Sequence, residues 1–400
     1  MAKILIAWEL GGGLGHMARA LPLALALRAA GHEIAFALRD LSRAESMLGQ
    51  HGFSFFQAPI WLPQLSGAPP AVSYPEILFQ AGYLDTNGLI GLVKGWHALV
   101  DTIRPDLLLL DHAPTALLAA RGKAIKKVLI GNGFFVPPRE TPMPAFRTWL
   151  TIEPQRLAAS EALALQRANH VLERLVAPKL GMLAELFDVD ENLLYTWPEL
   201  DHYPQRKGAR YWGPAYSLDN GAAPHWPAGQ GKQVFAYLKT DYRYLETLLQ
   251  ALRTAPCRVL AYVSGANAAL INKYQSASCT IVAEPINMEA ARQAADVIVC
   301  HAGSGTIAAA LHAGKPLLLA PTFAEAYMLA ESVARLGAGI NVPLSENPDF
   351  ARALQRMLQE STFAEYARAF AHKYRDFSQP VQIAQSVARI EEILRAPAVP

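Results

Sequence analysis

Short apolar runs recur along almost the whole chain, and each is about as long as a β-strand. Ten such runs lie at residues 3–8, 32–38, 53–56, 106–110, 127–131, 233–238, 258–263, 280–283, 297–300 and 316–320. The two halves of the chain therefore show the same pattern, although no sequence repeat relates them.

Longer segments with the apolar spacing of helices separate these runs. The clearest are at 19–30, 89–103, 115–121, 149–177, 179–187, 307–313 and 381–394. Because Pro22 disfavours an interior helical position, we expect the first helix to begin near Arg19. Strands that alternate with helices predict an α/β fold with parallel, doubly wound sheets.

Two segments interrupt the alternation. Residues 58–81 are rich in proline, glycine and aromatic residues, which favours an irregular wall over a ligand pocket. Residues 197–230 have a similar composition and separate the two halves. We therefore expect two Rossmann-like domains, at 1–215 and 216–379, and a terminal helix at 380–400 that packs back toward the first domain.

Composition supports two globular domains. The chain has 400 residues, of which 52% are hydrophobic and 18% charged, so it can bury two cores and shows no sign of disorder. Its formal net charge of +2 argues against a protein that mainly neutralises nucleic-acid phosphates. We expect no nucleic-acid partner.

Cysteine usage and the N-terminal residues bear on the compartment. The apolar run at 3–8 ends at Glu9 and a cluster of glycines, so we expect neither an export signal nor a membrane span. Cys257, Cys279 and Cys300 are an odd number and lie in apolar segments, which is typical of buried thiols in the cytoplasm. No metal-ligand spacing is present, and we expect no metal site.

The sequence CHAGSGT, at 300–306, lies between a predicted strand and a predicted helix. Gly303 and Gly305 allow close approach of the backbone, and the amides from Ser304 onward lie at a helix start, where anions bind. The His301 side chain and the Thr306 hydroxyl add two more hydrogen-bonding groups. This turn is a candidate phosphate site; the simpler alternative is a strand-to-helix turn with a buried, hydrogen-bonded histidine.

Reading on from His301, HAGSGTIAAALHAGKPLLLAPTFAEAYMLAESVARLGAGI resembles the donor-binding signature of the UDP-glycosyltransferase superfamily. The resemblance covers about forty residues and combines several spaced elements. It implies the GT-B fold, in which two Rossmann-like domains with parallel sheets face an interdomain cleft. It also implies an inverting sugar transfer with a nucleoside-diphosphate sugar as co-substrate, no other cofactor and no metal. The domain at 216–379 would bind the donor and the domain at 1–215 the acceptor.

Three further positions carry expectations from the resemblance. VFAYLKT is similar to the first strand and loop of the family's donor domain, which assigns Thr240 to the donor site. EPINMEAARQAAD, which contains Ile286, looks like the loop that presents backbone groups to the nucleobase. Glu325 is placed to accept hydrogen bonds from sugar hydroxyls.

The chain also departs from the family pattern. Lys239 stands where glycine is usual, Ala309 where a glutamate often binds ribose, and Ala326 where glutamine usually follows the acidic residue. These changes leave the sugar open, and the nucleoside open between uridine and thymidine. They also leave open whether transfer is reduced or lost.

In the first half, GGGLGH at 11–16 resembles the opening βα unit of the family, in which a histidine faces the acceptor. The resemblance assigns the catalytic base to His16 and places Gly13 and Gly15 in a loop at the cleft. An imidazole suits this task because it titrates near neutrality and can remove a hydroxyl proton. The alternative is a helix-start histidine bonded to nearby backbone.

A carboxylate that orients such a histidine would complete the site. Asp111 ends the strand-like PDLLLLD, and the carboxyl ends of parallel strands meet at one edge of a sheet. The resemblance assigns the same role to an aspartate there. Two alternatives stay open: that the neighbouring His112 is the functional residue, and that Asp111 only caps the following helix.

The sequence thus favours an inverting glycosyltransferase that acts on a hydroxyl-bearing, small-molecule or lipid-like acceptor and allows a peripheral membrane contact. Five aromatic residues are candidates for an apolar acceptor site, namely Trp61, Tyr74, Phe79, Tyr83 and Trp96. The alternatives are a nucleotide-sugar epimerase on the same scaffold and a non-catalytic nucleotide-sugar-binding relative. A dinucleotide oxidoreductase is disfavoured because His16 takes the place of the third glycine of its fingerprint.

Overall fold

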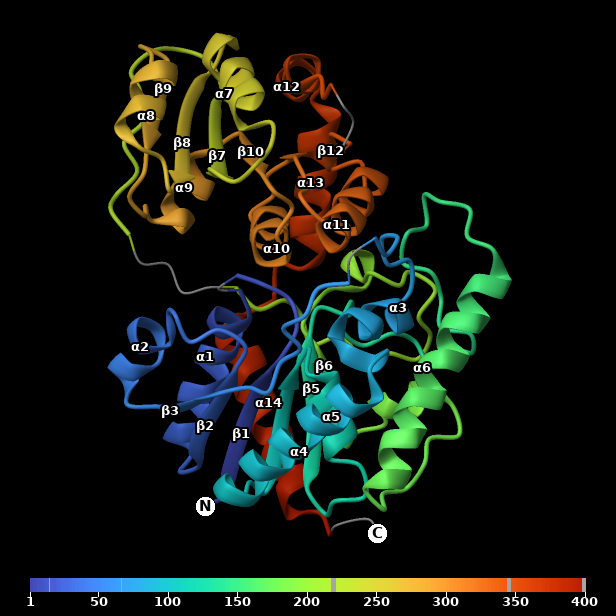
Figure 1. Ribbon diagram of the computed structural model, residues 1–400. Coiled ribbons are helices and arrows are strands. Elements are labelled where there is room, and N and C mark those ends of the chain that lie inside the picture. The colour runs from blue at the N-terminus through green and yellow to red at the C-terminus, as the bar shows by residue number, and fades with distance from the viewer. Residues whose placement is uncertain (14, 66, 217–220, 344–346, 398–400) are drawn as a thin grey trace. The chain divides into compact units, whose positions relative to one another are not determined.

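The computed structural model describes residues 1–13, 15–65, 67–216, 221–343 and 347–397. The chain divides into two compact units (Figure 1). Unit 1 consists of Met1–Ala215 together with Ser378–Pro400, and unit 2 of Tyr216–Phe377. The chain thus leaves unit 1 once and returns to it with its last helix.

Unit 1 contains a six-stranded sheet in the order β3-β2-β1-β4-β5-β6, with every neighbouring pair parallel. Its strands are β1 (Lys3–Trp8), β2 (Glu33–Leu38), β3 (Ser54–Gln57), β4 (Leu107–Asp111), β5 (Lys126–Gly131) and β6 (Glu191–Leu194). The order reverses between β1 and β4, and in such sheets the crevice beyond the carboxyl ends at this reversal binds ligands. Trp8 pairs with Asp111 there, so these two strand ends lie side by side.

Helices cover both faces of this sheet, because alternate strand residues point to opposite sides. Ile4 and Ile6 face a core that includes Ile390, whereas Leu5 and Ala7 face the core around Trp96. The helices of unit 1 are α1 (Gly15–Ala29), α2 (Ala44–Met47), α3 (Tyr74–Leu78), α4 (Thr86–Ile103), α5 (Pro114–Ala119), α6 (Pro154–Arg174) and α14 (Gln379–Arg395). None of the described helices is both long and apolar enough to cross a membrane.

The last helix, α14, packs against α1 (Figure 1). Its Ser386 is buried, and the Tyr195 hydroxyl donates to the serine oxygen at 3.0 Å. Gln382 donates to the carbonyl of Gly213, and Ile390 and Ile393 are buried. The helix therefore completes the core of unit 1 from the far end of the chain.

Unit 2 repeats this architecture with the strand order β12-β11-β10-β7-β8-β9, again all parallel. Its strands are β7 (Gln233–Lys239), β8 (Arg258–Ser264), β9 (Cys279–Val282), β10 (Val297–Cys300), β11 (Leu317–Leu319) and β12 (Gly339–Asn341). Its helices are α7 (Leu245–Thr254), α8 (Ala268–Tyr274), α9 (Met288–Ala294), α10 (Ser304–His312), α11 (Ala324–Arg335), α12 (Phe350–Gln359) and α13 (Thr362–Lys373). The strand order again reverses between β7 and β10, and both strands end beside the CHAGSGT turn. The predicted doubly wound α/β architecture is confirmed in both halves.

The first helix differs from its prediction, since α1 begins at Gly15 and keeps Pro22 in its interior. A proline there removes one helical hydrogen bond. The surrounding side chains offset this loss, because Met17, Ala20 and Leu23 are all buried in the core of unit 1. The earlier start places His16 inside the helix.

The prediction of an irregular region at 58–81 is wrong for the end of that region. Its end forms α3, and a π-helical segment follows at Phe79–Tyr83. Pro75 occupies the first turn of α3, where a missing amide costs nothing, so a proline there starts a helix and does not break one. The backbone between Ala58 and Val72 has no regular element in its described part.

Two further predictions need correction. The predicted helix at 179–187 is only the 3-10 segment Leu183–Phe187, since the amide of Gly181 donates to the Glu185 side chain. The outer strands β6 and β12 were not predicted, because their sequences, ENLL and GIN, contain polar residues or glycine and form no continuous apolar run. Three other 3-10 or π segments join the elements, namely Gly49–His51, Phe79–Tyr83 and Pro198–Leu200.

Candidate active site

The carboxyl ends of β1 and β4 carry the candidate acceptor-side residues of unit 1. His16 lies in the first turn of α1, and Asp111 is the last residue of β4. Gly11 joins β1 to this helix with φ +84, and a Cβ there would lie 2.6 Å from Nε2 of His16. Only glycine suits this position, on both conformational and steric grounds.

His16 and Asp111 are in contact. Nδ1 of His16 lies 3.1 Å from Oδ2 of Asp111, and the two side chains are 6% and 1% exposed. Neither atom has a hydrogen-bond partner with good angles among the described residues, so the contact is close but not well aligned. In unliganded sites such contacts are often poorly aligned. The remaining nitrogen, Nε2, faces the backbone at Gly11.

Arg19 joins this pair from the same helix as His16. Its Nη1 lies 3.6 Å from Oδ1 of Asp111, and its side chain is 10% exposed. Burial raises the pKa of Asp111, but the charges of Arg19 and His16 more than offset this, and the pKa lies below its ordinary value. Asp111 is therefore a carboxylate at neutral pH.

Aromatic rings hold the His16 imidazole. Trp8 stacks on one side at 5.0 Å between ring centroids, and Phe135 lies at 5.3 Å in a tilted arrangement. Phe135 also stacks on His112 at 4.3 Å and receives the Arg19 guanidinium at 5.5 Å from its ring centre. One phenylalanine therefore contacts three charged or polar members of the site.

His112 is buried directly after β4, with the positive φ of 49° that few non-glycine residues adopt. Neither of its ring nitrogens has a hydrogen-bond partner among the described residues. Burial, with the nearby His16 charge, lowers its pKa to about 3, so the ring is neutral at physiological pH. Since His16 has the carboxylate contact, the geometry favours His16 over His112 as the base.

Sequence reasoning missed Glu9, a buried carboxyl group that neighbours the site. Glu9 directly follows β1 and accepts the backbone amides of Thr115 at 2.9 Å and Ala116 at 3.3 Å, at the start of α5. Burial raises its pKa to about 7 despite these hydrogen bonds. Its place at a strand end was a usable signal, as was the three-residue spacing of Arg19 from His16. Nothing in the sequence singled out Phe135.

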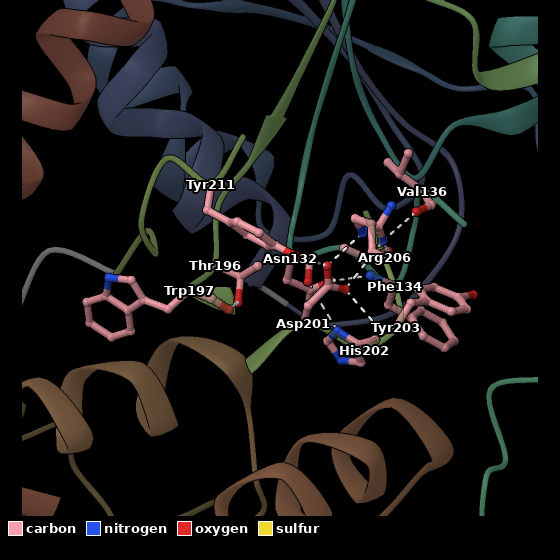
Figure 2. Close-up of polar contacts among 11 residues, drawn as sticks. Asn132, Phe134, Val136, Thr196, Trp197, Asp201, His202, Tyr203, Arg206 and Tyr211 are labelled. Atoms are coloured by element: carbon pink, nitrogen blue, oxygen red, sulfur yellow. Dashed lines mark hydrogen bonds and ion pairs between the residues drawn. The ribbon is translucent and has the colours of Figure 1, made fainter. Parts of the chain in front are cut away.

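An ion pair between Asp201 and Arg206 secures the loop that carries Phe135. Nε of Arg206 donates to Oδ2 of Asp201 at 2.6 Å, and its Nη2 donates to the carbonyls of Gly133 at 3.0 Å and Val136 at 2.8 Å. Figure 2 shows the guanidinium between the carboxylate and the Val136 carbonyl. Both carbonyls flank Phe135, so the ion pair fixes the backbone on either side of this ring.

Neighbouring residues support the same loop from the other side (Figure 2). The Tyr211 hydroxyl donates to Oδ2 of Asp201 at 2.8 Å, and the ring of His202 contacts the carbonyl of Asn132 through Nδ1 at 3.1 Å. Gly133 has φ +93, and a Cβ there would lie 2.7 Å from Oδ1 of Asp201. Several contacts therefore join the loop 132–136 to the segment that carries Asp201, His202 and Arg206.

The aromatic candidates from the sequence lie mostly in the core. Tyr74, Tyr83 and Trp96 are at most 1% exposed and belong to the hydrophobic core of unit 1. Trp61 packs against Gly82 and would meet a Cβ there at 2.9 Å. The rings beside His16 are instead Trp8 and Phe135.

In unit 2, the CHAGSGT turn joins β10 to α10. Gly303 occupies the N-cap position of α10, and Ala302 adopts a positive φ of 58° just before it. The first amides of a helix, here from Ser304 to Thr306, have no helical carbonyl to bind. The turn thus presents backbone donors to any anion held there.

His301 is fixed by two hydrogen bonds within this unit. Its Nδ1 donates to the carbonyl of Ala320 at 2.9 Å, and its Nε2 accepts the amide of Lys239 at 3.1 Å. Burial lowers its pKa, which agrees with a neutral ring that donates at Nδ1 only. The expected donation from His301 to a phosphate requires the contact with Lys239 to break.

The remaining donor-side candidates also lie in unit 2. Thr240 follows β7 next to the His301 contact, and its amide and hydroxyl both donate to the carbonyl of Ser264, at 3.2 and 3.3 Å. Ile286 is buried beside a backbone bridge to Ala222, and Glu325 lies in the first turn of α11. Thr240, His301 and the α10 turn are therefore brought together around β7 and β10.

The remaining expectations from the sequence concern four single positions and a metal site. Ala309 in α10 and Ala326 in α11 are both buried, and neither side chain offers a polar group to a ligand. In unit 1, Gly13 has φ +82 and Gly15 begins α1, next to His16. Within the described ranges, no three His, Cys, Asp or Glu side chains are grouped to hold a metal ion.

The two doubly wound domains have the GT-B fold, and the curated relative described below supports a glycosyltransferase. The family of the erythromycin biosynthesis protein CIII-like C-terminal domain matches residues 278–390. This match contains the donor signature, which resembles that of the UDP-glycosyltransferase superfamily.

Individual relatives extend over nearly the whole chain. The PGL/p-HBAD biosynthesis glycosyltransferase of Mycobacterium tuberculosis is 26% identical over 403 residues, which cover 94% of this chain and 90% of that protein. The kitacinnamycin glycotransferase superposes with a TM-score of 0.72 at 20% identity, over 98% and 99% of the two chains. The spinosyn rhamnosyltransferase SpnG complexed with thymidine diphosphate gives a TM-score of 0.68 at 18% identity, over 97% and 100%.

Proposed function

We propose that this glycosyltransferase works by a single displacement with inversion, and that His16 is its base. The observation that carries this proposal is the buried contact between Nδ1 of His16 and Asp111. Because Nδ1 faces the carboxylate, Nε2 is the atom that takes the acceptor's hydroxyl proton. The hydroxyl oxygen then bonds to the anomeric carbon, while the bond from that carbon to the diphosphate oxygen breaks and the nucleoside diphosphate leaves.

The turn from Gly303 to Thr306 binds the departing diphosphate in this proposal. Unpaired amides at a helix start stabilise negative charge where it develops. The Thr306 and Ser304 hydroxyls add donors without a change of net charge. A nucleoside-diphosphate sugar is then the only co-substrate, and no metal or further cofactor takes part.

The acceptor in this proposal is a hydrophobic, hydroxyl-bearing small molecule or lipid-like compound. The rings of Trp8 and Phe135 that flank His16 support it, since apolar rings favour apolar ligands. The donor carries thymidine or uridine diphosphate, and the SpnG complex with thymidine diphosphate supports the former. Ala309 and Ala326 leave ribose and sugar recognition to other groups.

A cytoplasmic location is part of the proposal. Cys257, Cys279 and Cys300 are all free and buried, and burial raises the pKa of the Cys300 thiol to about 12. Such thiols suit a reducing compartment. The epimerase and non-catalytic alternatives are less favoured, because the three compared relatives are all named as transferases.

Three measurements test this proposal. Thymidine or uridine diphosphate, with no metal present, should raise the melting temperature, because a ligand of the folded state stabilises it. The His16→Ala variant should keep this shift but lose at least about a hundredfold in transfer rate, the usual contribution of a positioned base. Full transfer by His16→Ala would refute the base. Activity that disappears with a chelator would refute the metal-free turn.

A further inference from the structure

We infer that Arg19 is a positioning residue of the His16–Asp111 pair, which keeps His16 unprotonated by sharing the charge of Asp111. The inference rests on the proposed role of His16 as base. The sequence assigns Arg19 to neither the donor site nor the acceptor site. The two grounds of the inference are the arrangement of three side chains and their burial.

The carboxylate of Asp111 lies between two cationic or basic groups. Oδ2 faces Nδ1 of His16 at 3.1 Å, and Oδ1 faces Nη1 of Arg19 at 3.6 Å. All three side chains are at most 10% exposed, so solvent screens their charges weakly. One carboxylate thus serves two partners.

Nη1 of Arg19 interacts with Asp111 through its charge and not through a directed hydrogen bond. Nη1 is buried and has no hydrogen-bond partner among the described residues. The guanidinium lies 5.5 Å from the ring centre of Phe135, which holds it beside the site. The carboxylate of Asp111 therefore compensates the charge of this guanidinium.

The effect of Arg19 follows from the summed charge of Arg19, Asp111 and His16. With Asp111 alone, a protonated His16 would form a neutral pair, and the low-dielectric site would favour that state. With Arg19 present, Asp111 is already neutralised, and protonation of His16 leaves a net positive charge. Arg19 therefore favours the neutral imidazole that can accept a proton, and it favours release of that proton after transfer.

Other ionisable groups around His16 are few. His112 follows β4 and is neutral at physiological pH. Glu9 follows β1, with Arg39 near it, and the Arg19 charge also acts on Tyr195 beyond β6. Of these groups, Glu9 changes its charge near pH 7, so its contribution to a pH profile has to be separated.

The experiment is the pH profile of kcat/KM for the wild-type chain, Arg19→Met and Arg19→Lys. In Arg19→Met the pH of half-maximal activity on the acidic side should rise by about one unit, the size expected for removal of one close charge. Activity should largely recover at about pH 9, above both midpoints. Arg19→Lys keeps the charge, and its midpoint should stay within about 0.3 units of wild type.

Two further variants serve as controls. Arg28→Met removes an exposed arginine from the last turn of the same helix and should leave the profile unchanged. Glu9→Gln removes the other group that titrates near pH 7 and should keep the acidic limb. If that limb disappears in Glu9→Gln, it belongs to Glu9 and the inference is wrong.

The outcomes separate this inference from the proposed function. An Arg19→Met midpoint equal to that of the wild-type chain, with activity lowered at every pH, makes Arg19 merely structural and overturns the inference. If His16→Ala also loses transfer in the same assay, the proposed function survives that result. If His16→Ala retains transfer, the proposed function fails, whatever Arg19 does.

Discussion

The carboxylate of Glu9 accepts the backbone amide of Thr115 at 2.9 Å, and so joins the turn after β1 to the first turn of α5. This bond ties together the two segments that carry His16 and Asp111. Because the bond spans 106 positions in sequence, it exists only in the folded chain. It also buries an ionisable group, which makes the stability of unit 1 depend on pH.

We expect Glu9→Gln to stabilise the protein at high pH. The pKa of Glu9 is raised from 4.5 to about 7 in the folded chain, so the folded state binds its proton more tightly than the unfolded state. Stability from this group is therefore present below pH 4.5 and is lost as pH rises through 7, at a cost of about 3 kcal/mol. The glutamine side chain cannot ionise, and its carbonyl oxygen can still accept the amide of Thr115.

The measurement is the free energy of unfolding in denaturant at about pH 5 and about pH 8. The difference between Glu9→Gln and wild type should grow with pH, and the comparison cancels the opposite contribution of His112 below pH 6.5. Glu45→Gln, at an exposed site on α2, is the control and should show no such growth. Equal slopes in Glu9→Gln and wild type would contradict the assignment.

Asp111→Asn should lower kcat by about a hundredfold or more, because the amide neither stabilises a protonated His16 nor neutralises Arg19. Nucleoside diphosphate affinity should be unchanged, since the donor turn lies in unit 2. Steady-state kinetics and calorimetry measure the two quantities. Asp101→Asn, at an exposed position of α4, should behave as wild type, and a loss of donor affinity in Asp111→Asn would argue against this division of roles.

Gly11→Ala should damage the site directly. A Cβ at this position would lie 2.6 Å from Nε2 of His16, and φ is +84. We expect unfolding free energy to fall by about 1 to 3 kcal/mol and transfer to fall with it. Gly12→Ala is a matched control, because nothing lies within 4 Å of its Cβ position and its φ is not positive. Two variants with equal activity would refute the crowding of His16.

Arg206→Met should destabilise unit 1 by about 3 to 5 kcal/mol, because it leaves the buried Asp201 carboxylate without its partner. The loop with Phe135 would lose its two anchors at Gly133 and Val136. We therefore expect the acceptor KM to rise more than the donor KM in the folded fraction. Denaturant unfolding and two-substrate kinetics test both effects.

The double variant Asp201→Asn/Arg206→Met separates charge from packing. It removes the unpaired carboxylate and should recover part of the stability lost in Arg206→Met. It should not restore the acceptor KM, because the hydrogen bonds of Arg206 to the carbonyls of Gly133 and Val136 stay absent. Recovery of neither quantity would mean that the arginine acts through its packing alone.

Local patterns were sufficient for the regular framework. All ten predicted strands lie within one residue of their observed bounds, and β1 and β10 match fully, because buried parallel strands are continuous apolar runs. The sequence was less informative where helices contain or begin with proline. Whether a helix includes Pro22 or Pro75 depends on the buried neighbouring residues and on the position of the proline within the helix, and a local sequence rule takes neither into account.

For the site, the sequence by itself determined the residues that stand at strand ends and helix starts. His16 comes from the resemblance of GGGLGH to the family's opening βα unit, Asp111 from the rule that parallel strands end at one edge together with the resemblance, and the CHAGSGT turn from the donor signature. Only the tertiary structure decided which side chains contact them. Glu9, Arg19, Phe135 and the Asp201–Arg206 pair come from four separate segments, and their contacts arise from the order of strands in the sheet and from burial, which no local spacing encodes.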